Sequence, residues 1–427
     1  MRHVVKEIKL KNGARGLLID VPEATVMSFQ FNFRAGNRFV KHHDIYETAH
    51  IMEHMAFGAN EKFKNEHAYE AEFTKNGAYH NASTGDLGME YIATCADFEW
   101  DRILELQQLS ITTPKFNQTE LEAEKGNVKS ELTGCLNNYN RVLWPKLQQT
   151  LGESVLTYPE RLKTIQNVSL ADVLEHYKRT HTAENLRFVI AGKLHGRRNT
   201  LKRMLENWRL PKGKRFSAPK DELHGTKLSL IRRKEAPNLT FGLSIILPHQ
   251  LNDEKEEAMA CLNHILTGTM YSRIYGAARK RGLVYGLFSD TSSYEHDSAW
   301  DFGGEVNLET AEELFDIIVR EMKAVIAGKI KDHEIETAKQ YALGRHQMGA
   351  QTATQISSFY SGRYFFDGVV RDYDKVPEEI ASVTRERIME TVKQFIGANT
   401  WILGGVASEG GELMENLRAK IATIFEE

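Results

Sequence analysis

An internal repeat is the feature that most constrains how this chain folds, because its two halves present the same order of apolar patterns. Alternating apolar residues at 26–33 and an apolar run at 239–247 predict a strand near the start of each half, the first of them half-buried. In each half that strand leads to a helical pattern, a strand pair, an amphipathic helix, a further helical stretch and a closing apolar strand. In the first half these segments are, in order, 46–57, 77–83 with 89–94, 98–110, 120–124 and 186–192. In the second half they are 254–266, 285–288 with 298–302, 311–327, 334–338 and 401–406.

This order of elements also indicates the fold class. Strands in runs with helices gathered around them are typical of α+β proteins. We therefore expect two tandem homologous domains, residues 1–208 and residues 225–427, each a mainly antiparallel sheet with helices packed on it. Residues 209–224 are expected to form the linker, because this stretch is rich in proline, glycine and lysine. A length of 427 residues is comfortable for two such domains.

Composition removes several classes of function. The net charge of −3 gives no excess that would favour nucleic acid or an anionic membrane. The most basic stretch, residues 197–215, lacks the interleaved aromatic residues of a stacking site, so we expect a solvated helix face there. The three cysteines lie far apart, which argues against disulfides and thiolate metal sites. Without a secretory signal or a long apolar run, the expectation is a soluble, cytoplasmic protein.

A candidate metal motif lies in the first predicted long helix. His50, Glu53 and His54 form the pattern H-x-x-E-H. Residues four apart share one face of a helix, so both imidazoles can reach one ion, and Glu53 can contact a water held by it. A five-residue match in a chain with 16 histidines is weak by itself. The alternative is a helix whose histidines and glutamate simply face water.

A third ligand is needed for a catalytic zinc ion, together with an open position for water. The helical stretch that follows residue 119 carries Glu124 and Glu131. These residues are seven apart, or about two helical turns, and therefore project from the same face. The alternative explanation of these glutamates is an exposed acidic helix face.

The motif and the interval to Glu131 resemble the pitrilysin-type (inverzincin) zinc metallopeptidases, which include insulin-degrading enzyme and the mitochondrial processing peptidase. The resemblance identifies a short, two-domain member of bacterial type. It implies that one zinc ion per chain is bound by His50, His54 and Glu131, that Glu53 is the general base, and that Glu124 supports the site. Beyond the motif, the resemblance rests on residues 33–38, 81–84 and 184–192.

The resemblance also implies a substrate site. The strand Asn81, Ala82, Ser83 and Thr84 is similar to the edge strand to which a peptide adds as one more strand in this family. An ordinary edge strand ending at a turn is the alternative. In the family an arginine and a tyrosine of the C-terminal domain grip the substrate carbonyl. Here Tyr285 is present, but the arginine position is Ala278, with Arg279 beside it.

The repeat provides an internal control for the metal site. Superposing the two halves places Ala260, Asn263 and His264 opposite His50, Glu53 and His54. The same alignment places Ala338 and Arg345 opposite Glu124 and Glu131. The second half has therefore lost nearly all of the metal-site groups, and an arginine at the third-ligand position would repel a cation.

The resemblance implies a zinc-dependent metalloendopeptidase that hydrolyses unfolded peptides in an enclosed chamber. The expected partners are peptide substrates and a second, related two-domain chain, in a homodimer or a heterodimer. One alternative is the zinc-binding subunit of a heterodimeric peptidase whose partner supplies the Arg–Tyr pair. Another is a non-catalytic scaffold subunit. A zinc-storage protein is disfavoured, because the additional cysteine and histidine ligands that such a role favours are missing.

Overall fold

The computed structural model describes residues 1–225 and 227–426 and divides into two compact units. Each unit contains one mixed sheet with helices, which confirms the α+β fold with two homologous domains. Each unit also includes a helical segment from the other half of the sequence, an exchange that the predicted boundaries at residues 208 and 225 do not include. Unit 1 consists of Met1–Gly134, Tyr158–Pro219 and Met348–Arg371, and unit 2 of Cys135–Thr157, Lys220–Gln347 and Asp372–Glu427.

The sheet of unit 1 has six strands in the order β1-β2-β6-β3-β5-β4. Strands β2 and β6 run parallel, and the other neighbouring pairs run antiparallel. Strand β4 lies at one edge of this sheet, with β5 as its neighbour. The strands are β1 (Val4–Lys9), β2 (Arg15–Asp20), β3 (Val26–Phe33), β4 (Tyr79–Thr84), β5 (Met89–Ala96) and β6 (Arg187–Gly192).

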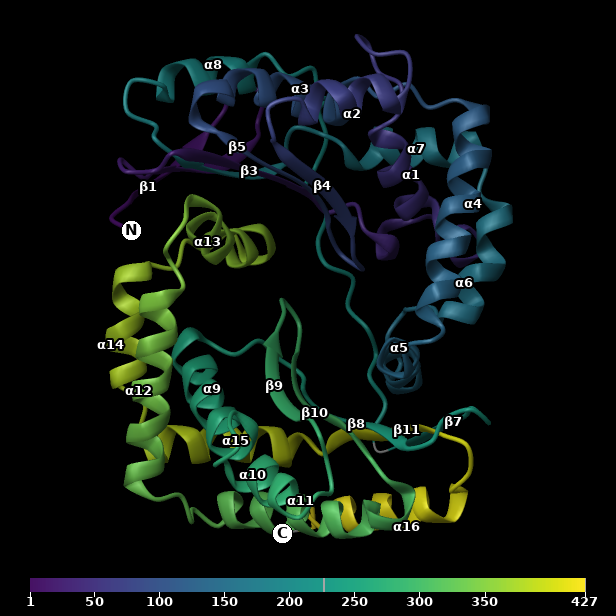
Figure 1. Cartoon of the computed structure of the whole chain (residues 1–427), viewed down its shortest axis with the longest axis vertical. Coiled ribbons are helices and arrows are strands. Elements are labelled where there is room, and N and C mark those ends of the chain that lie inside the picture. The colour runs from purple at the N-terminus through teal and green to yellow at the C-terminus, as the bar shows by residue number, and fades with distance from the viewer. Residues whose placement is uncertain (226, 427) are drawn as a thin grey trace. The chain divides into compact units, whose positions relative to one another are not determined.

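Helices cover both faces of this sheet, as Figure 1 shows for α3 and α8 on one side and α13 on the other. Helix α13 comes from the second half of the sequence and contacts β3 and β6. The helices of unit 1 are α1 (Thr48–Ala56), α2 (Glu66–Thr74), α3 (Trp100–Thr112), α4 (Gln118–Cys135, to residue 134), α6 (Tyr158–Thr164), α7 (Leu170–Thr180), α8 (Arg198–Glu206) and α13 (Ala353–Asp367).

Strand β3 shows why the exchange of α13 matters. Its odd-numbered side chains, such as Phe29 and Phe31, are fully buried in the apolar core. From Ser28 onward its even-numbered side chains are polar, and a half-buried strand would turn them toward water. Instead α13 packs on this face and buries Ser28 and Gln30, and both bond to Ser357 of that helix, at 2.8 Å and 3.2 Å. The prediction of a half-buried strand was therefore wrong for this face.

Unit 2 repeats the topology with five strands in the order β7-β11-β8-β10-β9. This is the order of β2, β6, β3, β5 and β4 in unit 1, with the same single parallel pair, here β7 and β11. The strands are β7 (Lys227–Arg232), β8 (Leu239–Leu247), β9 (Leu287–Ser293), β10 (Ser298–Val306) and β11 (Thr400–Ala407). The helices are α5 (Tyr139–Leu151), α9 (Asp253–Thr267), α10 (Arg273–Lys280), α11 (Ala311–Ile326), α12 (Asp332–Met348, to residue 347), α14 (Val376–Ala381), α15 (Arg385–Ala398) and α16 (Gly411–Ala422).

Helix α5, from the first half of the sequence, packs on the sheet of unit 2 through apolar contacts. Leu147 approaches the strands where they carry glycine. A Cβ atom at Gly404 would lie 2.2 Å from a methyl group of Leu147, and one at Gly242 would lie 2.9 Å from it. Two strand glycines therefore allow the helix to pack this closely.

The remaining expectations concern local features. Residues 209–225 form neither helix nor strand. Cys95, Cys135 and Cys261 are free and buried. Within residues 1–225 and 227–426, no helix combines the length and the apolar composition needed to cross a bilayer.

Candidate metal centre

Helix α1 fixes the H-x-x-E-H motif by burying its other face. Ile51, Met52 and Met55 are fully or almost fully buried in the core of unit 1. This packing determines the rotation of the helix, so that His50 and His54 project together on the side that faces α4. Their rings lie 4.9 Å apart, one turn along the helix.

Helix α4 supplies the glutamates in the same way. Leu121, Val128 and Leu132 pack into the core at helical spacing. Glu120, near the start of α4, accepts a hydrogen bond from the backbone N–H of Ala59, just beyond α1, at 3.1 Å. This contact ties the end of α1 to the start of α4.

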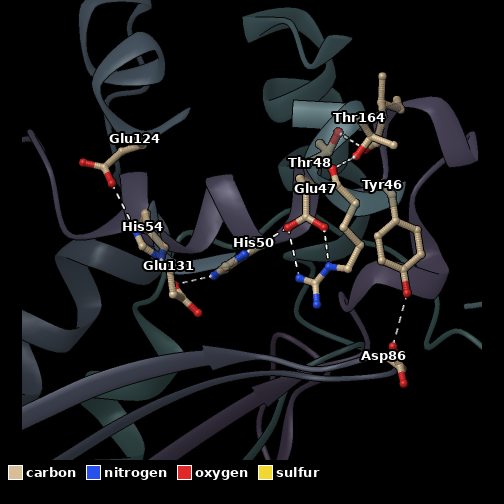
Figure 2. Close-up of polar contacts among 11 residues, drawn as sticks. Tyr46, Glu47, Thr48, His50, His54, Asp86, Glu124, Glu131 and Thr164 are labelled. Atoms are coloured by element: carbon tan, nitrogen blue, oxygen red, sulfur yellow. Dashed lines mark hydrogen bonds and ion pairs between the residues drawn. The ribbon is translucent and has the colours of Figure 1, made fainter. Parts of the chain in front are cut away.

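The two helices bring three potential ligands together, as Figure 2 shows. A carboxylate oxygen of Glu131 lies 3.4 Å from Nε2 of His50 and 3.7 Å from Nε2 of His54. The three ligand atoms all lie within 4.8 Å of one another. Atoms this close can share one ion at the usual zinc–ligand distances of about 2.0–2.2 Å. Half of the Glu131 side chain remains exposed, so the cluster is open to solvent on that side.

The second nitrogen of each imidazole is already engaged. Nδ1 of His54 lies 3.0 Å from a carboxylate oxygen of Glu124, and Nδ1 of His50 lies 3.0 Å from a carboxylate oxygen of Glu47. Because a carboxylate accepts, each Nδ1–H donates. The Nε2 atom of each ring, which lies on the side of Glu131, is therefore the atom that could coordinate an ion. Carboxylates in this position are the usual partners of metal-binding histidines. The residues present therefore fit a divalent cation.

The cluster is strongly charged without a cation. Burial lowers the pKa of His50, but the carboxylates of Glu131 and Glu47 more than offset it and raise that pKa to about 9. Burial likewise lowers the pKa of His54, and Glu124 and Glu131 raise it to about 10. The two imidazoles hold the pKa of Glu131 well below its usual range. The site therefore favours positive charge between these groups.

Glu53 lies on α1 between the two histidines and is 8% exposed. Burial raises the pKa of its carboxyl above the ordinary value, against the lowering effect of the Thr84 hydroxyl and of both imidazoles. A carboxylate with a raised pKa is a stronger proton acceptor. Its position suits a general base, although Glu53 belongs to none of the ligand contacts described above.

The predicted substrate strand is β4, which contacts α1. Asn81 and Ser83 are exposed, Ala82 is buried and Thr84 is half-buried. Within the described part of the chain, β4 pairs with β5 alone, so its other edge carries unpaired backbone groups. Such an edge can accept an extended peptide as a further strand.

The residues predicted in the second half lie in unit 2. The guanidinium of Arg279 lies 4.7 Å from the ring centre of Tyr285, and Tyr285 is 85% exposed. Ala278 is fully buried in the core of that unit. The structure thus brings Arg279 and Tyr285 together within unit 2, whereas the potential metal ligands His50, His54 and Glu131 belong to unit 1.

The repeat equivalents of the motif have structural contacts instead. Asn263, opposite Glu53, donates to Thr291 on β9 at 3.0 Å and accepts from the indole of Trp300 on β10 at 2.9 Å. His264 stacks on Tyr341 with ring centres 4.1 Å apart. Among the residues that the structure describes, the metal-type cluster of unit 1 has no counterpart in unit 2.

Two residues of the site were missed in the sequence. Glu47 lies three residues before His50, a spacing that could have indicated a contact on the same helical face. Arg161 holds Glu47 through both carboxylate oxygens. No pattern in the sequence links residue 161 to the motif, because the contact depends on how α6 packs against the turn His43–Ile45 that precedes α1.

Two family models match separate regions of the chain. The model described as "Insulinase (Peptidase family M16)" matches residues 22–154, and the model described as "Peptidase M16 inactive domain" matches residues 167–341. The first region contains the metal cluster. The second contains the repeat positions Ala260, Asn263, His264 and Ala338, whereas Arg345 lies just beyond it.

Curated relatives match part of the chain. Over 138 residues it is 30% identical to mitochondrial-processing peptidase subunit beta of Homo sapiens, and this match covers 31% of the chain and 28% of that protein. A match with the same subunit of Neurospora crassa spans 189 residues at 24% identity, or 43% of the chain and 39% of that protein. The matched regions thus span less than half the length of these relatives.

Solved structures match nearly the whole chain. A protease from Helicobacter pylori superposes with a TM-score of 0.82 at 14% identity, covering 95% of this chain and 100% of that one. A peptidase M16 inactive domain from Pseudomonas fluorescens gives a TM-score of 0.83 at 16% identity, covering 95% and 98%. At these identities the similarity establishes the fold.

Proposed function

Because the chain belongs to the pitrilysin-type M16 peptidase family, we propose that it is a zinc-dependent peptidase with its centre at His50, His54 and Glu131. The observation that carries the proposal is the convergence of these three ligand atoms, with both Nδ1 atoms held by carboxylates. This donor set, with two imidazoles, one carboxylate and a solvent-open side, is typical of catalytic zinc.

The chain's own residues would act as follows. When bound, zinc would supply a Lewis acid that polarises the scissile carbonyl and acidifies water. Glu53 takes the proton from the attacking water and passes it to the leaving nitrogen. Glu124 holds the ring of His54 through Nδ1 and so keeps Nε2 directed at the ligand cluster. Peptide-bond hydrolysis is the reaction class that these roles support.

The substrate class follows from strand β4. Its unpaired edge offers backbone groups beside α1, the helix that carries Glu53. A peptide can use that edge only when its own backbone is extended and unpaired, so we propose unfolded peptides as substrates. Main-chain hydrogen bonds depend little on side-chain identity, so we expect peptides of many different sequences to be accepted.

A partner is proposed from unit 2. Arg279 lies over Tyr285, so the guanidinium and phenol that relatives use to grip a substrate carbonyl are adjacent here. Arg279 is one residue later than the family arginine, and a shift of one residue on a helix turns a side chain by about 100°. We therefore propose pairing with a second two-domain chain that closes a chamber and brings a complete Arg–Tyr pair.

A second candidate function is a zinc-binding subunit with little activity of its own, or a non-catalytic scaffold. Ala278 favours it, because a methyl group cannot replace the charged donor that relatives carry at this position. The similarity to one subunit of a processing peptidase points the same way.

The test is zinc analysis beside an assay with a quenched fluorescent peptide, on the pure chain and on the chain with any co-purifying partner. About one zinc per chain is expected, with hydrolysis that a chelator abolishes and added zinc restores. Zinc without hydrolysis in either preparation would support the scaffold. Absence of stoichiometric zinc from metal-replete protein would contradict the metal centre itself.

A further inference from the structure

A buried ion pair lies behind one of the two ligand histidines. We propose that Glu47, held by Arg161, is the positioning residue for His50 and fixes its ring with Nε2 toward Glu131. The inference rests on the proposed function only for the identity of the ion, zinc. The motif H-x-x-E-H begins at His50 and does not include either residue of the pair.

The contacts of Glu47 account for its whole carboxylate. The side chain has no exposed surface. One oxygen accepts from Nδ1 of His50 at 3.0 Å and from Nη2 of Arg161 at 3.0 Å, and the other accepts from Nε of Arg161 at 2.6 Å. A carboxylate bound by both arms of a guanidinium has a fixed plane, so the direction in which it accepts from His50 is fixed too.

Arg161 is itself held in place. Its side chain is 17% exposed, and its guanidinium lies 5.2 Å from the ring centre of Tyr158 and 5.8 Å from that of Tyr46. A carboxylate enclosed as fully as Glu47 needs a compensating cation nearby, and Arg161 supplies it. Lysine could supply the charge but lacks the planar fork.

The two ligand histidines are therefore supported differently. Behind His54, Glu124 has a partly exposed side chain, and its second partner is the neutral amide of Asn127 at 3.1 Å. Behind His50, the partner is fully buried and paired with arginine. We therefore expect loss of the Glu47–Arg161 pair to disturb the orientation of His50 more than loss of Glu124 disturbs the orientation of His54.

A purely structural ion pair is the competing explanation, and the chain contains a second, more exposed arginine–carboxylate pair that serves as a control. Arg197 donates through two nitrogens to Asp97, one of these bonds being 2.9 Å long, and its guanidinium lies 5.5 Å from the ring centre of Trp100. This pair also belongs to unit 1, and the described contacts of Asp97 and Arg197 include neither ligand histidine.

The test compares Glu47→Gln, Arg161→Met and Arg161→Lys with Asp97→Asn in the full chain. In the zinc-free, ¹⁵N-histidine-labelled protein, the Nδ1–H proton of His50 should give a strongly downfield signal, assigned through its loss in His50→Gln. We expect this signal to be lost or shifted in Glu47→Gln and Arg161→Met and kept in Asp97→Asn. Thermal unfolding of each variant verifies that it is folded.

Zinc affinity, measured by competition with a chelator, is the second readout. Loss of such a support typically weakens metal binding 10- to 100-fold. We expect a loss of this size in Glu47→Gln, an intermediate loss in Arg161→Lys and wild-type affinity in Asp97→Asn. A folded Glu47→Gln protein with the wild-type His50 signal and affinity would overturn the proposal. Equal weakening by Asp97→Asn would overturn it too, because the effect would then be general.

The two hypotheses fail in different ways. If the wild-type chain binds no zinc but its His50 signal is lost in Glu47→Gln and kept in Asp97→Asn, the positioning role stands and the proposed function is contradicted. If the wild-type chain binds zinc and Glu47→Gln changes neither readout, the metal centre stands and the positioning role is contradicted.

Discussion

Nδ1 of His54 on α1 lies 3.0 Å from the carboxylate of Glu124 on α4, two helical turns before the proposed ligand Glu131 on the same helix. One face of α4 thus supplies both a proposed ligand and a carboxylate that contacts the ring of another proposed ligand. The spacing of seven residues makes this possible, because both glutamates project from α4 in the same direction.

Glu53→Gln is expected to abolish hydrolysis while zinc stays bound. The amide keeps the shape of the side chain but cannot accept the proton of water, and loss of a general base typically costs about a hundredfold or more in rate. Peptide turnover and zinc content should be measured on the same preparation. The control is Glu105→Gln on α3, an exposed position that should keep full activity. Normal turnover by Glu53→Gln at full zinc occupancy would exclude Glu53 as the base.

Glu131→Gln is expected to lose zinc, because a neutral amide is a poor ligand for this ion. Elemental analysis should show about one equivalent in the wild-type chain and little in the variant. Glu122→Gln, on the same helix at an exposed position, should retain zinc. Two equivalents in the wild type, or full zinc retention when His50 and His54 are both replaced by alanine, would show that the ion is bound elsewhere.

Zinc binding is expected to release protons at neutral pH. With pKa values of about 9 and about 10, both His50 and His54 carry a proton that the ion must displace below those values. Affinity should therefore rise with pH, by up to about a hundredfold per pH unit near pH 7, and level off above pH 10. Calorimetry in buffers of different ionisation enthalpy counts the protons. Release of none at pH 7 would contradict these pKa directions.

His181 is expected to make unit 1 acid-sensitive. Burial lowers the pKa of this fully buried histidine from 6.5 to about 3. The unfolded chain binds the proton first, so stability is complete above pH 6.5 and falls as the pH is lowered toward 3, by about 1.4 kcal/mol per pH unit. Urea unfolding of zinc-free protein should show a shallower fall between pH 6.5 and 5 in His181→Gln. Parallel curves for variant and wild type would contradict the prediction.

The pure chain is expected to be a weak peptidase that gains activity with a related second chain. The reason is that Ala278 stands at the arginine position of the family, and Arg279 lies one residue out of register. Size-exclusion chromatography and peptide turnover, with and without a co-purifying chain, measure this. Full activity of a pure homodimer that is lost in Arg279→Ala would show that no second gene product is needed.

The sequence by itself predicted the strands and helices that recur in both halves, and three residues that could hold a metal ion. Apolar alternation and helical spacing are local properties, and they reappear in β3, α1 and α4. The pairing of Glu131 with His50 and His54 came from a motif interval, and the structure brings these residues within ligand distance of one another. The repeat also identifies Asn263 as the counterpart of Glu53, and the structure shows that Asn263 bonds to Thr291 and Trp300.

Only the tertiary structure decided which segments complete each unit. From the sequence, the polar face of β3 is expected to face solvent, because nothing near Ser28 and Gln30 indicates another partner. In the structure α13, more than three hundred residues later, supplies the hydroxyl group to which both side chains bond. The same reason applies to Arg161. A charge that compensates a buried carboxylate must be close in space, and packing of α6 against the turn before α1 provides that proximity without any periodic pattern in the sequence.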